Sequence, residues 1–494
     1  MISATILSRS VEAIRVSFIN RDHELAALEE IWGMRRQVAL LWGRRRVGKS
    51  TLLQRFAEGK PGIFYQAVEG TAAEQLLGLT TRILAFRPDP VLAAAALTNW
   101  DQAIAYLVGL ARDAKRDGHP LLVVLDEFPY LSVSTPRLPS LFQSALEDVK
   151  REDLPLYLVL AGSQITMFER HVLHGPLFSR RTWGEQLPPL SYQDAGRFFP
   201  TWSPADRLRA WAVVGGIPYY LEQFDPARSL AWNIENRILR KGQVLYDEAE
   251  LFVKEELGSD AATYLSIIAA VASGATRQSE IANRAGIAAT SAPSYLAQLR
   301  RLHVLDHVRP INAPNNARSG IWRVADGYLR FWFRFVRPSL TDLEARRSAR
   351  VYRDRVRPDL DHFVSLPAFE DACREHLRAS IGADPAYPAH GEVGAWWGPI
   401  PDERHPGTKR TRQGEIELVA YEGSRLVFAG EAKWHDGDVD IDALAQLEAG
   451  VRFVPGFGPH TKLAVYARDG FTPRLRTRAG ASGVILRTVA DLFA

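Results

Sequence analysis

A glycine-rich loop between an apolar run and a helix-forming stretch constrains the fold more than any other feature of the chain. The apolar run 37–42 is followed directly by Gly43-Arg44-Arg45-Arg46-Val47-Gly48-Lys49-Ser50, and residues 51–53 continue as a helix. Glycines let successive backbone N–H groups curl around a phosphate, and a helix N-terminus adds a positive dipole end. The loop therefore predicts a phosphate-binding site at the end of a parallel strand.

The spacing G-x-x-x-x-G-K-[ST] assigns a role to each loop position. Lys49 is expected to reach the β- and γ-phosphates of ATP, and Ser50 to bind Mg²⁺. The remaining residues expected around the nucleotide are Gly43, Arg44, Arg45, Arg46, Val47, Gly48 and Thr51. The alternative, a chance glycine–lysine loop, is disfavoured by the flanking strand and helix.

A second acidic element supports a nucleotide site. The apolar run 121–125 ends in Asp126 and Glu127. Asp126 is expected to hold Mg²⁺ and Glu127 to polarise the attacking water as a general base. Two acids at a strand end are also compatible with an ordinary solvated terminus, but their position downstream of the glycine-rich loop favours the nucleotide site.

Further candidates follow the fourth apolar run, 156–161. Ser163 or Gln164 is placed to sense the γ-phosphate, and Arg180 or Arg181 to contribute an arginine finger, in cis or to a neighbouring subunit. For the two arginines, an ordinary surface loop is an equally good interpretation.

The periodicity and composition predict an α/β protein. Short apolar runs at 37–42, 63–67, 121–125 and 156–161 alternate with helical patterns at 73–84 and 100–115, which is the rhythm of a parallel sheet. One cysteine, Cys373, excludes an internal disulfide and is typical of a reducing cytoplasm. We expect no membrane span, and no secretory signal in residues 1–18.

At this point the chain resembles the archaeal-type ATPases of the AAA+/STAND group, which carry a C-terminal domain of unknown function. The segment 18–25, with Arg21, is similar to the family's F-x-x-R-x-x-E-L box, which lies beside the adenine. Gly215-Gly216-Ile217-Pro218 resembles the G-x-P turn of STAND ATPases. The resemblance implies that Pro218 approaches the nucleotide; without it, the turn would be an ordinary helix break.

The middle of the chain predicts a winged helix. A helix from Thr276, a turn at Gly286 and a second helix over 291–302 precede a strand-like segment at 304–309, and 310–320 is expected to be a loop. Such modules bind DNA or pack against proteins, and both alternatives stay open. Residues 300–357 hold fourteen arginines and five acids, which suits nucleic acid but also a solvated surface.

An aromatic row occupies residues 328–335, YLRFWFRF, and resembles a signature of the same ATPase family. Aromatic side chains can stack on bases, but a buried packing core is the favoured interpretation.

Carboxylates and a lysine recur in the last third. Glu417 lies in one strand-like run, and Glu431 and Lys433 lie in the next, after a turn at 422–424. Side chains two apart on a strand share a face, so the three are expected to meet. Two carboxylates that bind Mg²⁺ and a lysine that orients water are the chemistry of phosphodiester hydrolysis.

This pattern resembles the PD-(D/E)xK restriction-endonuclease-like superfamily, and Glu370 matches an additional acidic residue that many members carry on a helix. The resemblance implies metal binding by Glu370, Glu417 and Glu431, and catalysis by Glu417, Glu431 and Lys433. Glu417 stands where the superfamily usually has aspartate, so its reach differs by one methylene. Alternating charges on an edge strand are the structural alternative.

Together these features predict an α/β P-loop NTPase sheet with a helical lid, a winged helix-turn-helix and a restriction-endonuclease-like α/β domain. The expected boundaries are 1–188, 189–258, 259–340 and 341–494. We expect a cytoplasmic Mg²⁺-dependent ATPase coupled to a DNA-binding, nuclease-like module. The alternative is a STAND-like scaffold or transcriptional regulator with an inactive nuclease fold. Homo-oligomers and a partner protein both stay open.

Overall fold

The structure is a computed structural model that describes residues 18–34, 37–311, 313, 320–401 and 410–494. The chain divides into two compact units, Met1–Pro188 and Pro189–Ala494, and each is described by itself. The predicted absence of a signal in residues 1–18 and most of the predicted loop 310–320 lie outside the described residues. The division of the second unit at 258 and 340 stays a prediction.

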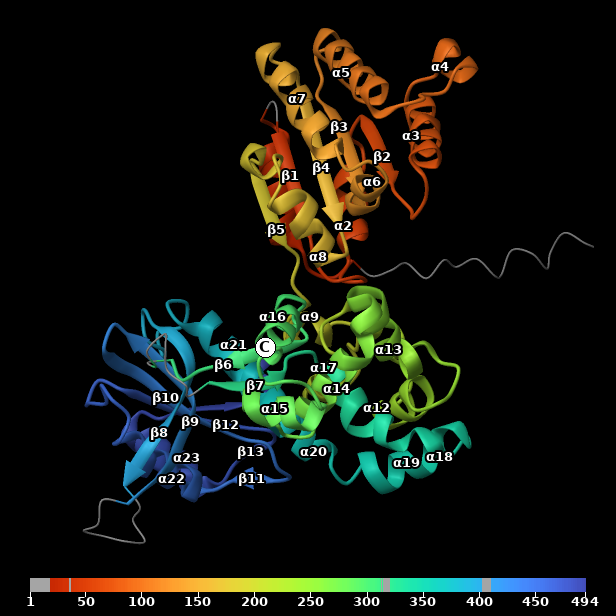
Figure 1. The fold of residues 1–494 in the computed structure, drawn as a ribbon. Helices are drawn as coiled ribbons and strands as arrows, with labels where there is room; N and C mark the ends of the chain where they lie inside the picture. Colours follow the sequence, from red (N-terminus) through yellow and green to blue (C-terminus); the bar gives the residue numbers. More distant parts are fainter. Residues whose placement is uncertain (1–17, 35–36, 312, 314–319, 402–409) are drawn as a thin grey trace, which may run out of the picture. The chain divides into compact units, whose positions relative to one another are not determined.

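The first unit is built on a five-stranded parallel sheet (Figure 1). Its strand order is β2-β3-β4-β1-β5. The strands are β1 (Gln37–Trp42), β2 (Gly62–Gln66), β3 (Leu121–Asp126), β4 (Leu156–Gly162) and β5 (Trp183–Gln186). Strands β3 and β4 are buried throughout, as their continuous apolar sequences require when helices cover both faces.

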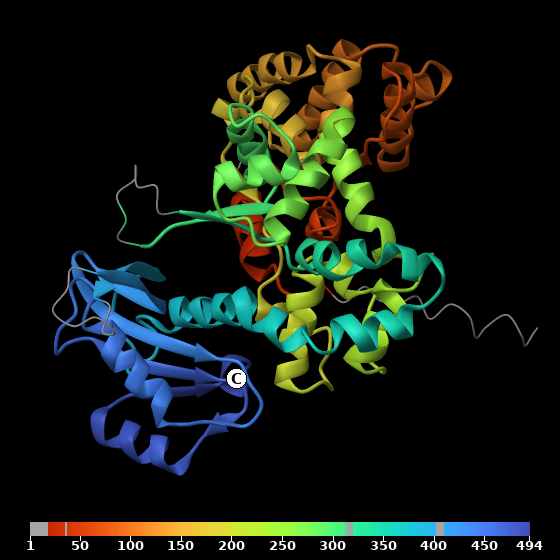
Figure 2. The same ribbon diagram turned by 60° about the horizontal axis from the view of Figure 1, so that its bottom comes forward.

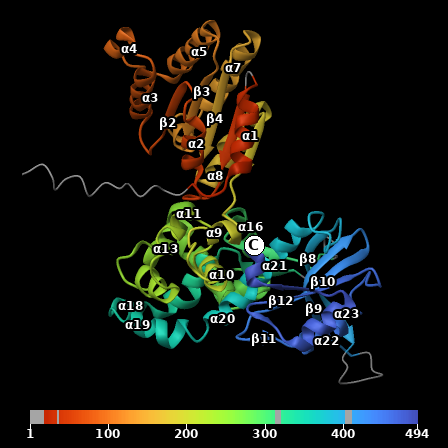
Figure 3. The ribbon, with the colours of Figure 1, turned by 180° about the vertical axis from the view of Figure 1, so that it is seen from behind.

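Helices flank this sheet on both sides: α1 stands in front of it when it is seen from behind, whereas α7 stands in front in the opposite view (Figures 1 and 3). The helices are α1 (Asp22–Trp32), α2 (Lys49–Ala57), α3 (Ala72–Phe86), α4 (Pro90–Ala94), α5 (Trp100–Asp117), α6 (Phe128–Ser134), α7 (Leu138–Arg151) and α8 (Ile165–Phe168). The prediction of alternating strands and helices in this part of the chain is confirmed.

The second unit begins with helices and a hairpin. Its helices are α9 (Tyr192–Gly196), α10 (Pro204–Val214), α11 (Pro218–Leu221), α12 (Leu230–Asn233), α13 (Val244–Leu257), α14 (Ala261–Ala272), α15 (Gln278–Ala285), α16 (Ala292–Arg301), α17 (Gly327–Phe331), α18 (Leu340–Glu344), α19 (Ser348–Val351) and α20 (Leu360–Phe363). Strands β6 (Leu305–Val308) and β7 (Ile321–Val324) pair antiparallel after α16. Residues 328–333, apart from Arg330, are buried, which confirms the prediction that the aromatic row is packing core.

The end of the second unit is a mixed five-stranded sheet with the order β14-β12-β10-β9-β8. Its strands are β8 (Glu392–Pro401), β9 (Thr411–Glu422), β10 (Arg425–Lys433), β12 (Lys462–Ala467) and β14 (Ile485–Thr488). Helix α21 (Glu370–Ser380) packs on β8 and β9 (Figure 2). Its companions are α22 (Ile441–Val451), α23 (Pro473–Ser482) and α24 (Val489–Leu492), and β11 (Asp438–Val439) pairs with β13 (Gly470–Phe471).

The hairpin between β9 and β10 forms where the sequence predicts it. Glu422 and Arg425 are opposite each other, and Gly423 has a φ of 60°, which favours glycine. Within the described ranges, no helix is both long and apolar enough to span a bilayer.

Candidate functional sites

The predicted phosphate loop joins the end of β1 to the start of α2 and depends on two glycines. Gly43 has a φ of 152°, and a Cβ there would lie 2.7 Å from the carbonyl oxygen of Leu187. Gly48 has a φ of 101° and precedes the first residue of α2. Larger residues would strain the backbone at both positions, so the loop conformation requires glycine at each end.

Lys49 lies inside this loop. Its Nζ donates hydrogen bonds to the carbonyl oxygens of Gly43 (3.0 Å) and Arg44 (3.1 Å), and the side chain is buried. A buried ammonium at the N-terminus of α2 adds a full positive charge to the positive end of the helix dipole. The loop therefore fits the phosphates of a nucleotide in both shape and charge.

Ser50 and Asp126 are brought together across the sheet. The Ser50 hydroxyl donates a 2.6 Å hydrogen bond to Oδ2 of Asp126, whose side chain is fully buried. Burial raises the pKa of Asp126, and the hydrogen bond from Ser50 opposes that rise. A hydroxyl and a carboxylate beside a phosphate loop are the oxygen ligands that suit Mg²⁺, so this pair fits the predicted metal.

Glu127 points its carboxylate at Ser163. Oε2 of Glu127 accepts hydrogen bonds from the backbone N–H of Ser163 (3.0 Å) and from its hydroxyl (2.9 Å). Glu127 also has a φ of 55°, which is unusual outside glycine. The sequence placed both residues at strand ends, but it did not predict that they bind each other. The adjacency of β3 and β4 produces the contact.

The remaining candidates of the first unit are held by local contacts. Gln164 lies near the hydroxyl of Tyr130, at 3.4 Å. Arg180 forms an ion pair with Glu147, and the guanidinium of Arg181 lies 3.5 Å from the ring centre of Phe178. These contacts do not assign a nucleotide role to Gln164, Arg180 or Arg181, so their sensing and finger roles stay predictions.

The side chain of Arg21 stabilises the phosphate loop through hydrogen bonds. Its guanidinium donates hydrogen bonds to the carbonyl oxygens of Val47 (3.3 Å) and Pro188 (2.7 Å), and it pairs with Glu24 at 3.1 Å. The sequence associated Arg21 with the adenine and did not predict this bracing. In the second unit, Pro218 begins α11. Its predicted approach to the nucleotide stays a prediction.

In the second unit, strands β9 and β10 bring Glu417, Glu431 and Lys433 together. Glu417 accepts a 2.5 Å hydrogen bond from the backbone N–H of Ala432, and Lys433 donates a 2.5 Å hydrogen bond to Glu431. The shared face predicted for Glu431 and Lys433 is therefore present. We call Glu370, Glu417, Glu431 and Lys433 the carboxylate cluster.

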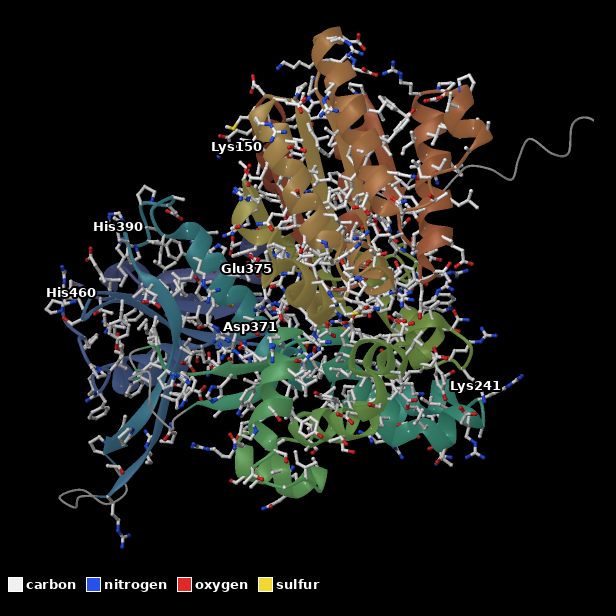
Figure 4. All side chains as sticks on the ribbon, turned by 45° about the horizontal axis from the view of Figure 1, so that its top comes forward. Lys150, Lys241, Asp371, Glu375, His390 and His460 are labelled. Carbon is white, nitrogen blue, oxygen red and sulfur yellow. The ribbon has the colours of Figure 1, made fainter. Side chains whose placement is uncertain are left out.

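Arg374, on α21, contacts both Glu370 and Glu417 of the carboxylate cluster. Its buried guanidinium donates to the carbonyl oxygen of Glu417 (2.7 Å) and to Asp371 (2.7 Å), and lies 3.4 Å from Glu370. Asp371 and Glu375 lie along the same helix (Figure 4). The sequence gave no signal for Arg374, because its partners on β9 are distant along the chain.

The carboxylate cluster gathers buried carboxyl groups that oppose one another's ionisation. Burial, together with the neighbouring Glu431 and Glu370, raises the pKa of Glu417 to about 8. Burial also raises the pKa of Glu370 to about 7, against the opposing charge of Arg374. For Lys433, burial lowers the pKa, but Glu431, Glu417 and Glu370 together outweigh burial and the net shift is upward. A site of this kind gains from a bound cation or from protons.

The described residues contain no group of three His, Cys, Asp or Glu side chains placed to hold a metal ion. Glu370, Glu417 and Glu431 interact electrostatically without forming a closed ligand shell. Their carboxylate chemistry suits Mg²⁺ or Mn²⁺. Metal binding by the carboxylate cluster therefore stays a prediction.

Two family models match the chain. Residues 18–224 match the model of an ATPase domain predominantly from Archaea. This part of the chain is therefore similar to an archaeal-type P-loop ATPase domain. The match extends past Pro188 and includes the turn at 215–218 of the second unit. Residues 332–445 match a family described as Archaea bacterial proteins of unknown function.

Two curated relatives come from Methanocaldococcus jannaschii. An uncharacterized protein is 26% identical over 424 residues, which cover 85% of this chain and 88% of the relative. An uncharacterized ATP-binding protein is 46% identical over 46 residues, which cover 9% of this chain and 78% of the relative.

Two solved structures align with part of this chain. The Walker-type ATPase of Pyrococcus abyssi aligns with a TM-score of 0.49 and 20% identity over 65% of this chain and 97% of that chain. The ORC2 protein of Aeropyrum pernix aligns with a TM-score of 0.43 and 16% identity over 66% of this chain and 94% of that chain.

Proposed function

We propose that this protein is a Mg²⁺-dependent ATPase that works as a nucleotide-driven switch. The observation that carries the proposal is the buried Lys49 inside a glycine-bounded loop, beside the Ser50–Asp126 pair. In this arrangement a cation, a helix dipole and an acidic strand end meet where a triphosphate and its metal need them.

Lys49 and Ser50 each hold a contact that ATP would replace. Lys49 would exchange the carbonyl oxygens of Gly43 and Arg44 for phosphate oxygens. Ser50 would release Asp126, and both would become ligands or supports of Mg²⁺. Bound Mg²⁺ would neutralise charge on the phosphates during hydrolysis. In this proposal the loop is preformed. Lys49 and Ser50 exchange their hydrogen-bond partners when ATP binds, and the backbone of the loop stays in place.

Glu127 sets the rate in this proposal. To act as a general base, its carboxylate must accept a proton from water. Both hydrogen bonds from Ser163 reach the same oxygen, Oε2, so they restrain the carboxylate, and we expect this restraint to slow turnover. A restrained base suits slow turnover, as expected of a switch.

The test is γ-phosphate release by the purified full chain with Mg²⁺. Wild-type protein should hydrolyse ATP, and Lys49→Ala should lose about 100-fold or more of that rate. Lys150→Ala is the matched control, because Lys150 lies at the exposed end of α7 (Figure 4). Equal rates for wild type and Lys49→Ala would reject the ATPase.

A second function is supported by the carboxylate cluster. The order α21-β8-β9-β10-α22-β12 is the arrangement that we interpret as the nuclease-like domain, and α14-α15-α16 with the β6–β7 hairpin is our winged helix. Lys433 would orient water, and Glu370, Glu417 and Glu431 would hold Mg²⁺ or Mn²⁺. Water would attack phosphorus and lose a proton to solvent, and the P–O bond to one sugar oxygen would break, with that oxygen taking up a proton and leaving as a hydroxyl.

Cleavage is tested on linear and circular DNA and on RNA, with Mg²⁺ or Mn²⁺, with and without ATP. The expected result is cleavage by wild type and none by Lys433→Ala. If the two proteins leave the substrates equally intact, the domain is a passive binder. The protein would then be a STAND-like scaffold or regulator, and ATP should change its oligomer size without cleavage.

A further inference from the structure

The second unit contains a cavity of about 550 Å³ that borders the carboxylate cluster, since Glu370 and Arg374 also line it. It is formed by the end of α14, strand β7, the segment from α20 into α21, and strands β8 and β9. Pockets for small molecules usually measure about 300–1,000 Å³. The cavity is therefore large enough for an organic ligand and much larger than an inorganic ion needs.

Two arginine side chains in the cavity wall carry unused hydrogen-bond donors. Within the described part of the chain, Nε of Arg330 and Nε of Arg323 are buried and have no hydrogen-bond acceptor. A buried donor without an acceptor costs free energy, which an arriving acceptor recovers. Guanidinium groups pair best with phosphate or carboxylate, so these donors indicate an anion.

The charges around Arg330 also favour an anion. Its guanidinium lies 4.2 Å from the ring centre of Phe363, and burial lowers its pKa to about 9. Asp371 and Asp326 both act on Arg330 electrostatically, but Asp371 is already hydrogen-bonded to Arg323 and Arg374. Within the described residues, Arg330 therefore shares Asp371 with two other arginines.

The rest of the wall indicates what the anion is attached to. Trp322, Trp397, Phe363 and Ile321 give the cavity a largely aromatic and apolar lining. Flat aromatic walls suit a planar group such as a base. Glu370 and Glu415 also line the cavity and can accept hydrogen bonds from hydroxyl or amino groups of a ligand.

We propose that this cavity binds a nucleoside monophosphate group, either as a free nucleotide or as one nucleotide of a nucleic-acid strand. The phosphate pairs with Arg330 and Arg323, the base lies against the tryptophans, and the carboxylates accept from the sugar or base. The proposal requires neither ATP turnover nor strand cleavage.

Binding is measured by calorimetry on the full chain, with and without saturating ATP and Mg²⁺. The probes are dTMP, AMP, a thymidine pentanucleotide, thymidine and inorganic phosphate. We expect dTMP or the pentanucleotide to bind at least about tenfold more tightly than thymidine or phosphate alone. Binding of dTMP assigns a free nucleotide, and binding of the pentanucleotide alone assigns a strand.

Arg330→Met should weaken nucleotide binding by about tenfold or more. Arg350→Met is the matched control, because Arg350 is an exposed arginine on α19 outside the cavity. A second pair of variants avoids the buried wall. Leu366 lines the cavity and is 52% exposed, so a charge there disturbs the fold little.

Leu366→Glu should weaken nucleotide binding by a few-fold at low salt, and Leu366→Lys should strengthen it. The proposal is overturned if none of the nucleotides binds, or if thymidine or phosphate binds as tightly as dTMP. It is also overturned if Arg330→Met and the two Leu366 variants all bind as wild type does.

Discussion

The phosphate loop of the first unit and the carboxylate cluster of the second combine the same kinds of groups in opposite proportions. In the loop, Lys49 and Asp126 each have a neutral partner, a backbone carbonyl or the Ser50 hydroxyl. In the cluster, Glu370, Glu417 and Glu431 are gathered around Lys433. Each charged group of the loop therefore has a neutral partner without a ligand, whereas the carboxyl groups of the cluster lie close to one another.

This difference follows from how each site is built. The loop takes its residues from one short segment and one adjacent strand end, so the backbone alone prearranges it. The cluster draws acids from a helix and two strands, so folding forces like charges together. We therefore expect the loop to favour an anion and the cluster to favour a cation.

Removing the arginine that stabilises the cluster gives the largest expected effect. Arg374→Met leaves the buried Glu370 without its guanidinium partner and leaves Asp371 paired with Arg323 alone, and it should lower the free energy of unfolding by about 3–5 kcal/mol. Denaturant unfolding measures it. Arg378→Met, an exposed position on the same helix, should change little. Equal stabilities of the two variants would contradict the buried charge network.

Glu127→Gln tests the general base proposed beside the phosphate loop. The amide cannot take a proton from water, so ATP turnover should fall about 100-fold. ATP affinity should stay within a few-fold of wild type, because the carboxylate of Glu127 accepts its hydrogen bonds from Ser163. Turnover and equilibrium binding measured on the same preparation separate the two effects. A variant that hydrolyses ATP normally would remove Glu127 from the mechanism.

Glu417→Gln tests the cation preference of the cluster. Replacing this carboxylate should weaken Mn²⁺ binding to the second unit by about tenfold, since it removes one ionic ligand. Calorimetry with ATP absent measures the affinity. Glu422→Gln, at the exposed end of the same strand, is the control. If both variants bind Mn²⁺ as wild type does, the cluster is not a metal site.

Asp361 gives the smallest effect, and it depends on pH. Burial alone would raise the pKa of Asp361, but Trp434, Arg209 and Arg468 hold it below its ordinary value. A lowered folded pKa stabilises the protein above the unfolded value of about 3.9, and that stability is lost as pH falls through the folded value.

Thermal unfolding measured at several pH values tests the direction of this change in stability. Asp361→Asn should be slightly less stable than wild type near pH 7, and the two melting temperatures should converge below about pH 4. A difference that grows as pH falls would contradict the assignment. The ion pairs are partly exposed, so the effect should be small and should shrink at high salt.

The sequence predicts the loop and the strands well, because each is specified by consecutive residues. The apolar runs became β1 to β4, and the turn at Gly423 formed as expected. The contacts of Arg21 and Arg374 were not predicted, because their partners are distant along the chain. Arg21 reaches a carbonyl 167 residues away and Arg374 one 43 residues away. Sheet order, which local patterns do not encode, also created the Glu127–Ser163 contact.

Equilibrium binding of ATP with Mg²⁺ to the purified full chain tests the central claim most directly. Wild type should bind, and Lys49→Ala should bind at least about tenfold more weakly, because the variant loses the cation that faces the phosphates. Identical affinities, or no binding by wild type, would contradict the account.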